Sequence, residues 1–385
     1  MNMINESSQQ LANGEVKLTD KLINLKEFEV EAHKRVDKDA WGYYKSGANY
    51  EVTLRENEGS YNKLRIRPRF FNKDVSQIDM RTKVQGQQIA FPIGVSPTAM
   101  QRMANPIGEI GTARACREMN TVYTMSTLAT WSVEDVAREA PGGLKWLQLY
   151  IYKDREVSLR LVRRAEAAGF KALVVTVDLP IMGQRYDDMR NKFVLPEHYK
   201  LANFSDELAA MEKDHQGFGF QNYVTDAFDA TLTWKDVEWF KNQTRLPLIV
   251  KGILTAEDAI LAVDHGASGI VVSNHGARQL DTVPTSIEVL PEIVRAVGHK
   301  VEIYLDGGIR SGTDVLKALA LGAKMVFIGR PAIWGLACGG ESGVIKVLQI
   351  IKQELKVAMA LSGCPTLEDI TPSLICRSNS FWSNL

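Results

Sequence analysis

The chain has 385 residues, and its 46 basic and 46 acidic side chains give a formal net charge of zero. Its 45% hydrophobic and 24% charged residues are typical of a folded globular protein, and the length suits one large domain such as an α/β barrel. The neutral balance gives no electrostatic footprint for nucleic acid, the apolar runs are too short for a membrane span, and four widely spaced cysteines predict neither a disulfide framework nor a metal site.

The first 90 residues are predicted to form a tail and a helical segment. Residues 1–20 are rich in Asn, Ser and Gln, and we expect a flexible tail there. Apolar positions at helical spacing predict one helix over 25–45, which ends at Ser46. Residues 65–86 are irregular and predict a short strand pair or an extended connection. The whole segment 21–90 is expected to pack on the domain that follows.

Eight short apolar, β-branched runs come next, and most of the gaps between them have helical periodicity. The runs are Phe91–Val95, Thr121–Met125, Trp146–Ile151, Ala172–Val177, Pro247–Val250, Gly269–Val272, Val301–Leu305 and Met325–Ile328. Alternating strands and helices predict a parallel sheet, and eight such units predict an α/β fold of the (β/α)₈ TIM barrel type over 91–372, with a C-terminal tail at 373–385. The alternative is an open doubly wound sheet, which normally carries a Gly-rich fingerprint after its first strand. No such fingerprint follows Phe91–Val95, so we favour the barrel.

One interval is too long for an ordinary connection between a strand and the next helix. It spans residues 187–235, directly after the fourth predicted strand. Its mixture of polar and aromatic residues predicts an insertion that acts as a lid over the active-site face. A disordered surface excursion is the alternative for its central part.

Polar and ionisable side chains follow nearly every predicted strand. In barrels of this type, ligands bind at the carboxyl ends of the strands. After the seventh and eighth strands, Gly307-Gly308 with Arg310 and Arg330 predict a phosphate site, because glycine lets the backbone approach closely and guanidinium groups supply donors. The alternative is a tight turn flanked by surface arginines.

Two strand-end residues predict catalytic chemistry. His275 follows the sixth strand and predicts a general base, with Asp178 at the fourth strand end to orient it. Lys251 ends the fifth strand, so its ammonium is expected inside the barrel mouth beside an anionic group. The alternatives are a structural histidine and a structural salt bridge.

Two arginines predict a carboxylate site. Guanidinium forks bind carboxylates through paired hydrogen bonds, and Arg185 and Arg278 follow the fourth and sixth strands. Tyr150 at the third strand end and Tyr43 in the N-terminal helix are candidates to add phenolic hydrogen bonds. Core packing is the alternative for Tyr43, because an aromatic residue at helical spacing usually packs in a core.

Several runs resemble the FMN-dependent 2-hydroxy acid oxidase family of the glycolate oxidase type. They include SPTAMQRMANPIGE, VVTVDLPIMGQR, VVSNHGARQLD and YLDGGIRSGTDVLKALALGA, and the likeness extends from Leu25 to about Pro372. The resemblance implies a (β/α)₈ barrel, FMN as the cofactor, and a small 2-hydroxy acid and O₂ as substrates. It also implies a homo-oligomer, a tetramer in this family.

The resemblance also implies roles for individual residues. His275 corresponds to the base and Asp178 to its partner, while Arg185, Arg278, Tyr43 and Tyr150 correspond to the groups that hold the substrate. Lys251 corresponds to the lysine beside the part of the flavin that gains negative charge. The implied cofactor contacts are Pro97, Thr98, Ala99, Ser126, Gln148, Thr176, Lys251, Ser273, Asp306, Gly308, Arg310, Gly329 and Arg330.

Three departures from the family pattern affect the prediction. Leu128 stands where glycolate oxidases carry a tryptophan, which predicts a shorter, apolar wall and substrates larger than glycolate. Gln184 replaces an arginine that commonly precedes Arg185. The terminal Ser383-Asn384-Leu385 is close to a peroxisomal address, so we expect the peroxisome or the cytoplasm.

The leading hypothesis is an FMN-dependent (S)-2-hydroxy acid oxidase that forms a 2-oxo acid and reduces O₂ to hydrogen peroxide. The first alternative is a dehydrogenase with the same site that passes electrons to another acceptor. The second is a flavin-binding scaffold without catalysis, which the presence of the base and both clamp arginines disfavours.

Overall fold

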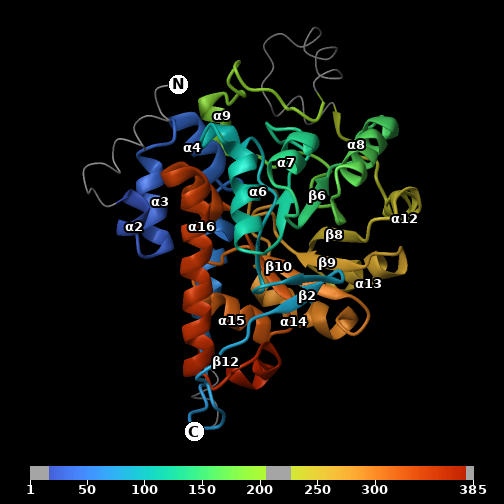
Figure 1. Cartoon of the computed structure of the whole chain (residues 1–385). Coiled ribbons are helices and arrows are strands. Elements are labelled where there is room, and N and C mark those ends of the chain that lie inside the picture. The colour runs from blue at the N-terminus through green and yellow to red at the C-terminus, as the bar shows by residue number, and fades with distance from the viewer. Residues whose placement is uncertain (1–16, 205–226, 379–385) are drawn as a thin grey trace.

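Eight parallel strands form a closed barrel at the centre of the molecule (Figure 1). The computed structural model describes residues 17–204 and 227–378. The barrel strands are β4 (Ile93–Val95), β5 (Tyr123–Met125), β6 (Lys145–Leu149), β7 (Ala172–Thr176), β8 (Leu248–Ile253), β9 (Gly269–Val272), β10 (Glu302–Asp306) and β11 (Met325–Ile328). They pair in sequence order, and β11 pairs with β4 to close the ring. The predicted (β/α)₈ barrel and all eight strands are therefore confirmed.

Side chains fill the inside of the barrel and close the end at which its strands begin. Trp146 packs against Tyr304 and Phe327, with ring centroids 5.4 and 5.6 Å apart. A hairpin of β2 (Thr82–Val84) and β3 (Gln87–Ile89) adds Val84 and Ile89 to the same buried cluster. The amino ends of the strands are thus sealed by apolar packing, and the carboxyl ends remain to line a cavity.

Helices cover the outside of the barrel. They are α6 (Gly108–Glu118), α7 (Val133–Glu139), α8 (Arg155–Ala167), α12 (Trp234–Gln243), α13 (Ala256–Asp264), α14 (Ser286–Val297), α15 (Gly312–Ala320) and α16 (Arg330–Leu361). In α14, Ile287, Leu290, Ile293 and Val297 are buried, and this spacing places them on one face of a helix. A kink at Gly339–Gly340 divides α16. The helical patterns between the strands therefore correspond to real helices.

The N-terminal segment departs from the prediction of a single helix over 25–45, which is wrong. The structure has α3 (Leu25–His33) and α4 (Lys38–Lys45), joined by a turn, and α4 ends before Ser46 as expected. Apolar spacing continues across the turn because both helices bury a face, although against different neighbours: α3 packs on α16 and α4 on α9 (Tyr186–Asn191). Two further helices, α2 (Leu18–Lys21) and α5 (Val52–Asn62), were not predicted.

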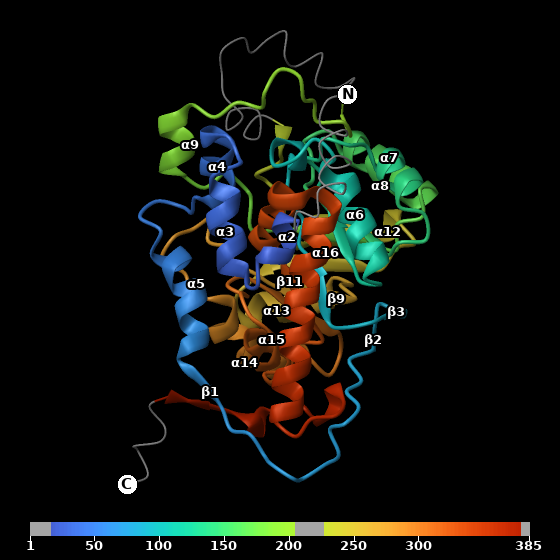
Figure 2. The same cartoon turned by 60° about the vertical axis from the view of Figure 1, so that its left-hand side comes forward.

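The strand that follows α5 lies beside the C-terminal strand at the bottom of Figure 2. Strand β1 (Leu64–Ile66) pairs antiparallel with β12 (Ile375–Arg377), so part of the segment assigned to a C-terminal tail is a strand. Short 3₁₀ turns occur at η1 (Gln101–Met103), η2 (Leu367–Asp369) and η3 (Pro372–Leu374). Within the described ranges, no helix combines the length and the apolar content needed to cross a membrane.

The predicted insertion over 187–235 is described only at its two ends. Its first part contains α9, and its last part contains Phe228, which forms an isolated antiparallel bridge with Tyr152. The central part, on which the lid prediction depends, lies outside the described residues, so the lid stays a prediction.

Candidate active site

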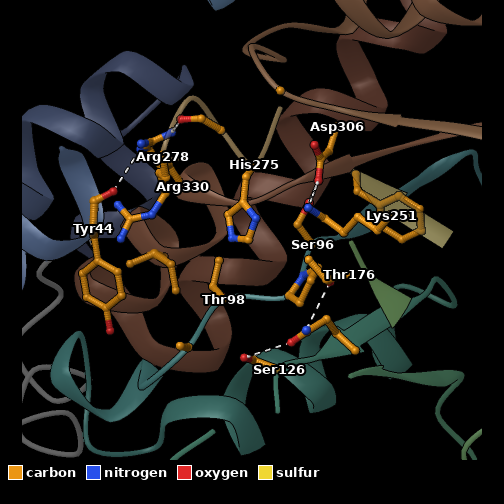
Figure 3. Close-up of a pocket in the computed structure, with 18 of the residues that line it drawn as sticks. Tyr44, Ser96, Thr98, Ser126, Thr176, Lys251, His275, Arg278, Asp306 and Arg330 are labelled. Atoms are coloured by element: carbon orange, nitrogen blue, oxygen red, sulfur yellow. Dashed lines mark hydrogen bonds and ion pairs between the residues drawn. The ribbon is translucent and has the colours of Figure 1, made fainter. Parts of the chain in front are cut away.

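A cavity of about 1220 Å³, including the space open to solvent at its mouth, lies at the carboxyl ends of the barrel strands. Every site residue predicted from the sequence lines it except Asp178 and Ser273. These two contact lining residues directly: Asp178 bonds His275, and Ser273 bonds Lys251. Side chains separated by more than 200 residues in sequence, such as Ser96 and Asp306, thus meet in one site (Figure 3).

His275 lines the cavity and forms a hydrogen-bonded pair with Asp178. His275 Nδ1 lies 2.8 Å from Asp178 Oδ1, which fixes the proton on Nδ1 and leaves Nε2 as an acceptor. Nε2 lies 3.4 Å from the hydroxyl of Tyr150. The backbone of His275 is left-handed (φ 57°), a conformation that costs a non-glycine residue energy and that commonly marks a functional constraint.

Burial favours the neutral form of the histidine, and the neighbouring histidine favours the ionised form of the aspartate. Burial lowers the pKa of His275, and the positive charge of Lys251 lowers it further, although Asp178 opposes both effects. Burial alone would raise the pKa of Asp178, but attraction to His275 and its hydrogen bond hold that pKa below the usual value. A neutral imidazole beside a carboxylate is the arrangement that a general base requires.

Lys251 is a buried cation beside the carboxylate of Asp306, one oxygen of which lacks a hydrogen-bond partner among the described residues. Its Nζ donates to Ser273 Oγ at 2.9 Å and lies 3.4 Å from Asp306 Oδ2, which also accepts from Ser96 Oγ at 3.4 Å. The other oxygen of Asp306 is buried, and within the described residues it has no hydrogen-bond partner. A buried acceptor without a donor costs free energy, so the site is suited to a ligand that brings a hydroxyl group.

Arg185 and Arg278 place two positive charges on one side of the cavity. Burial, followed by repulsion from Arg278, lowers the pKa of Arg185 to about 10. Arg278 Nη1 donates to the carbonyl oxygens of Tyr43 at 2.5 Å and Ser46 at 3.0 Å, and its guanidinium lies 4.9 Å from the ring centroid of Tyr43. Two like charges held together in a buried site attract an anion, and a carboxylate matches their geometry.

Hydrogen-bonded amide and hydroxyl groups line the floor of the cavity. Gln148 Nε2 donates to Thr176 Oγ1 at 3.1 Å, and Gln148 Oε1 accepts from Ser126 Oγ at 3.4 Å (Figure 3). Thr127 N adds a bond of 3.1 Å to the same oxygen. The chain from Ser126 to Thr176 therefore presents a fixed polar surface across three neighbouring strand ends.

The turn after β10 forms a glycine cradle. Gly307 and Gly308 both have positive φ (100° and 80°), and a Cβ on Gly308 would lie 2.0 Å from the carbonyl oxygen of Asn57. Arg310 follows, with a buried Nε that has no hydrogen-bond partner among the described residues. Arg330 is the first residue of α16, where backbone N–H groups point out of the helix. The glycine cradle with Arg310 and the start of α16 with Arg330 both suit a phosphate.

Gln279 is a site residue that the sequence reasoning missed. Its Nε2 donates to the carbonyl oxygens of Asp178 and Ile181, each at 3.0 Å. Its Oε1 accepts from Arg185 Nη2 at 3.2 Å and from Gly183 N at 3.3 Å. The side-chain amide of Gln279 thereby holds both the guanidinium of Arg185 and the backbone of Asp178 in position. Its place next to Arg278 in the chain is the only signal that could have drawn attention to it.

The wall of the cavity near Leu128 is more apolar than the sequence indicated. Leu128 is buried, and Leu179, Met182 and Phe228 also line the cavity. Phe228 stacks on Tyr150 with ring centroids 4.8 Å apart. Leu179 and Met182 follow β7, so the signal was a pair of apolar residues between Asp178 and Arg185 in the loop after that strand.

Comparisons with known proteins agree with this geometry. The sequence profile of the FMN-dependent dehydrogenase family matches residues 32–377. The chain is 50% identical to 2-hydroxyacid oxidase 1 of Mus musculus over 361 residues, which cover 93% of this chain and 97% of the relative. It is 50% identical to glycolate oxidase of Spinacia oleracea over 355 residues, covering 92% and 95% of the two chains.

Solved structures show the same likeness. The crystal structure of a mandelate oxidase with (S)-4-hydroxymandelic acid superposes with a TM-score of 0.86 at 41% identity, covering 91% of this chain and 97% of that one. Because the family profile spans nearly the whole described barrel and the relatives align along almost their full lengths, this chain belongs to the FMN-dependent dehydrogenase family.

Proposed function

We propose that this protein is an FMN-dependent (S)-2-hydroxy acid oxidase, which converts a 2-hydroxy acid to the 2-oxo acid and passes the electrons to O₂. The observation that carries the proposal is the neutral base His275, supported by Asp178, in the same cavity as the paired cations Arg185 and Arg278. A base beside a carboxylate clamp suits a substrate with a hydroxyl group next to a carboxylate.

The residues present fit FMN, which is the family's cofactor. The Gly307-Gly308 cradle with Arg310 and Arg330 suits a single phosphate, and the buried unpaired oxygen of Asp306 suits a ribityl hydroxyl. Lys251 suits the ring, where it would oppose added negative charge. The remaining proposed contacts are Ser273, which bonds Lys251, and the cavity-lining residues Pro97, Thr98, Ala99, Ser126, Gln148, Thr176 and Gly329.

The protein's own groups hold the substrate and move one proton. Arg185 and Arg278 bind the carboxylate, and Tyr43 and Tyr150, which line the same cavity, contact substrate oxygens through their hydroxyl groups. His275 Nε2 accepts a substrate proton, and Asp178 stabilises the imidazolium that results. FMN supplies the electron sink for the two electrons that leave with the other hydrogen. The side chains of His275 and Arg185 are only 19% and 4% exposed, which limits the access of water to these groups.

A dehydrogenase that uses another electron acceptor is the second candidate, and the same site supports it. The names of the relatives in mouse and spinach, a hydroxyacid oxidase and a glycolate oxidase, favour oxygen. Steady-state oxygen uptake with one peroxide formed per substrate tests the proposal. Turnover with an artificial acceptor but no peroxide in air would refute the oxidase and support the dehydrogenase.

We also propose that the substrate carries an apolar side chain. Leu128, Leu179, Met182 and Phe228 are apolar residues that line the cavity, and glycolate, with hydrogen in place of a side chain, has no apolar group to contact them. Each buried methylene is worth about 0.8 kcal/mol, or roughly fourfold in affinity. We expect a higher kcat/KM for lactate and longer 2-hydroxy acids than for glycolate, and Leu128→Trp should shift the preference back. A panel in which glycolate is best and the variant leaves the ranking unchanged would refute this.

The assembly and the location of the protein remain predictions. We propose a tetramer, which sedimentation of the purified protein tests directly. Peroxisomal import is proposed from Ser383-Asn384-Leu385, which lies outside the described residues. A fluorescent fusion that keeps these residues exposed, compared with one that lacks them, tests it.

A further inference from the structure

Helix α5 is held firmly against the phosphate cradle. At its start, the backbone N–H groups of Val52 and Thr53 donate to the carboxylate of Asp281 at 3.2 and 2.9 Å. In its middle, Asn57 and Asn274 exchange side-chain hydrogen bonds, of which the shorter is 2.7 Å. These contacts leave α5 little freedom to move away from the barrel.

Two residues of α5 contact the cradle itself. The hydroxyl of Tyr61 donates to the carbonyl oxygen of Gly307 at 3.0 Å, and the backbone of Asn57 lies against Gly308. The position of the residue after Asn57 is therefore set by the same contacts that shape the phosphate turn.

The residue after Asn57 is Glu58, and its carboxylate forms an ion pair with the guanidinium of Arg310. Arg310 Nη2 and Glu58 Oε1 are 3.0 Å apart, and both residues line the cavity. The side chain of Glu58 is 50% exposed and that of Arg310 is 23% exposed, so the pair lies at the rim and the carboxylate can turn toward solvent. The other contacts of the guanidinium are weaker: Nη1 bonds the adjacent Ile309 carbonyl, and the buried Nε has no partner among the described residues.

We propose that Glu58 competes with the phosphate of FMN for the guanidinium of Arg310. This inference rests on the proposed function, in which Arg310 binds that phosphate. A carboxylate and a phosphate are both anions that bind a guanidinium through its paired N–H groups, so one displaces or weakens the other. Glu58 satisfies Arg310 when the cradle is empty, and it lowers the affinity of the protein for FMN.

We can infer the direction and the size of the change in FMN affinity that follows when the carboxylate of Glu58 is removed. Removing the carboxylate frees Arg310 and also removes a negative charge from the neighbourhood of the phosphate, so both consequences tighten cofactor binding. Partly exposed ion pairs contribute little free energy, and the corresponding gain in FMN affinity is about fivefold at low salt. Raised ionic strength screens the pair, so the gain should shrink in high salt.

The test measures FMN release from the holoenzyme on serial dilution, followed by flavin fluorescence. Glu58→Gln should lower the dissociation constant about fivefold relative to wild type. Glu56→Gln is the matched control, because Glu56 is an exposed acid on the same helix that does not line the cavity, and it should leave the constant unchanged. An unchanged or weaker affinity in Glu58→Gln would overturn the proposal.

Two further measurements locate the effect at the phosphate. Riboflavin, which lacks the phosphate, should bind wild type and Glu58→Gln equally, and a gain for riboflavin would overturn the proposal. Arg310→Met should weaken FMN binding, and Glu58→Gln should add no gain in that background. If the gain persists there, the competition for Arg310 is refuted. If Arg310→Met leaves FMN affinity unchanged, the proposed phosphate site itself is wrong.

Discussion

Replacing Asp178 by asparagine separates the charge of the His275 partner from its shape. Asparagine retains an oxygen that can accept from Nδ1, so the tautomer with a free Nε2 is kept. The negative charge, which raises the pKa of His275 against the effects of burial and Lys251, is lost. The pKa of His275 should therefore fall further below its usual value of about 6.5.

The size of the change follows from the 2.8 Å hydrogen bond. A hydrogen bond to a charged group contributes about 1.5–3 kcal/mol, and one between neutral groups about 0.5–1.5 kcal/mol. The difference of roughly 1–1.5 kcal/mol corresponds to about one pKa unit. The imidazolium that forms when the proton is transferred loses the same stabilisation, so the rate at the plateau should fall about tenfold.

The assay is the pH dependence of kcat/KM, which reports the base in the free enzyme. Activity in wild type is lost as the pH falls through the pKa of His275, because the protonated imidazole cannot accept a proton. Asp178→Asn should move this acidic limb about one unit lower and reduce the plateau about tenfold. Asp187→Asn, a half-exposed acid that pairs with Arg190, is the control and should change neither. An acidic limb that moves to higher pH, or an unchanged plateau, would refute the assignment of the pair.

Three other variants test the remaining roles. Lys251→Met should slow flavin reduction in rapid mixing far more than it weakens substrate binding, since the lysine opposes charge that develops during the reaction; an unchanged reduction rate would make it structural. Arg278→Lys should mainly weaken binding of a 2-oxo acid, about 10-fold or more, because an ammonium lacks the paired geometry; a loss of turnover with normal binding would contradict this. Gln279→Leu should both raise KM and lower kcat, since it loses one hydrogen bond to the clamp residue Arg185 and one to the backbone of Asp178, whereas the exposed Gln184→Leu should have no effect.

The barrel could be predicted because its strands are buried on both faces. Such strands are short, continuous apolar runs, and the runs at Ala172 and Met325, for example, begin where the structure begins β7 and β11. The strand ends then indicated the site, since the topology of a closed parallel barrel brings all of them to one rim. Residues far apart in the sequence therefore lie together in the cavity because they follow different strands that end at the same rim.

The parts that were missed depend on tertiary contacts that leave no local pattern. The turn between α3 and α4 falls inside a continuous apolar period, because both helices are amphipathic on either side of it. Helix α5 begins at Val52 with its N–H groups capped by Asp281, a residue more than 200 positions away. Three of the four hydrogen bonds of Gln279 go to backbone groups, which every residue possesses and no sequence motif specifies.

The site arginines also explain why the N-terminal segment belongs to the active site. Arg330 donates to the carbonyl oxygens of Tyr44, Ser46 and Gly276 at 2.9, 3.0 and 2.9 Å, and Arg278 donates to Ser46 as well. Burial lowers the pKa of Arg330 to about 9, so its charge is retained at neutral pH but is costly to leave unpaired. A barrel without α4 and the loop after it would bury these guanidinium groups with few acceptors. The N-terminal helices therefore satisfy one side of each arginine, and that leaves the other side to bind an anion in the cavity.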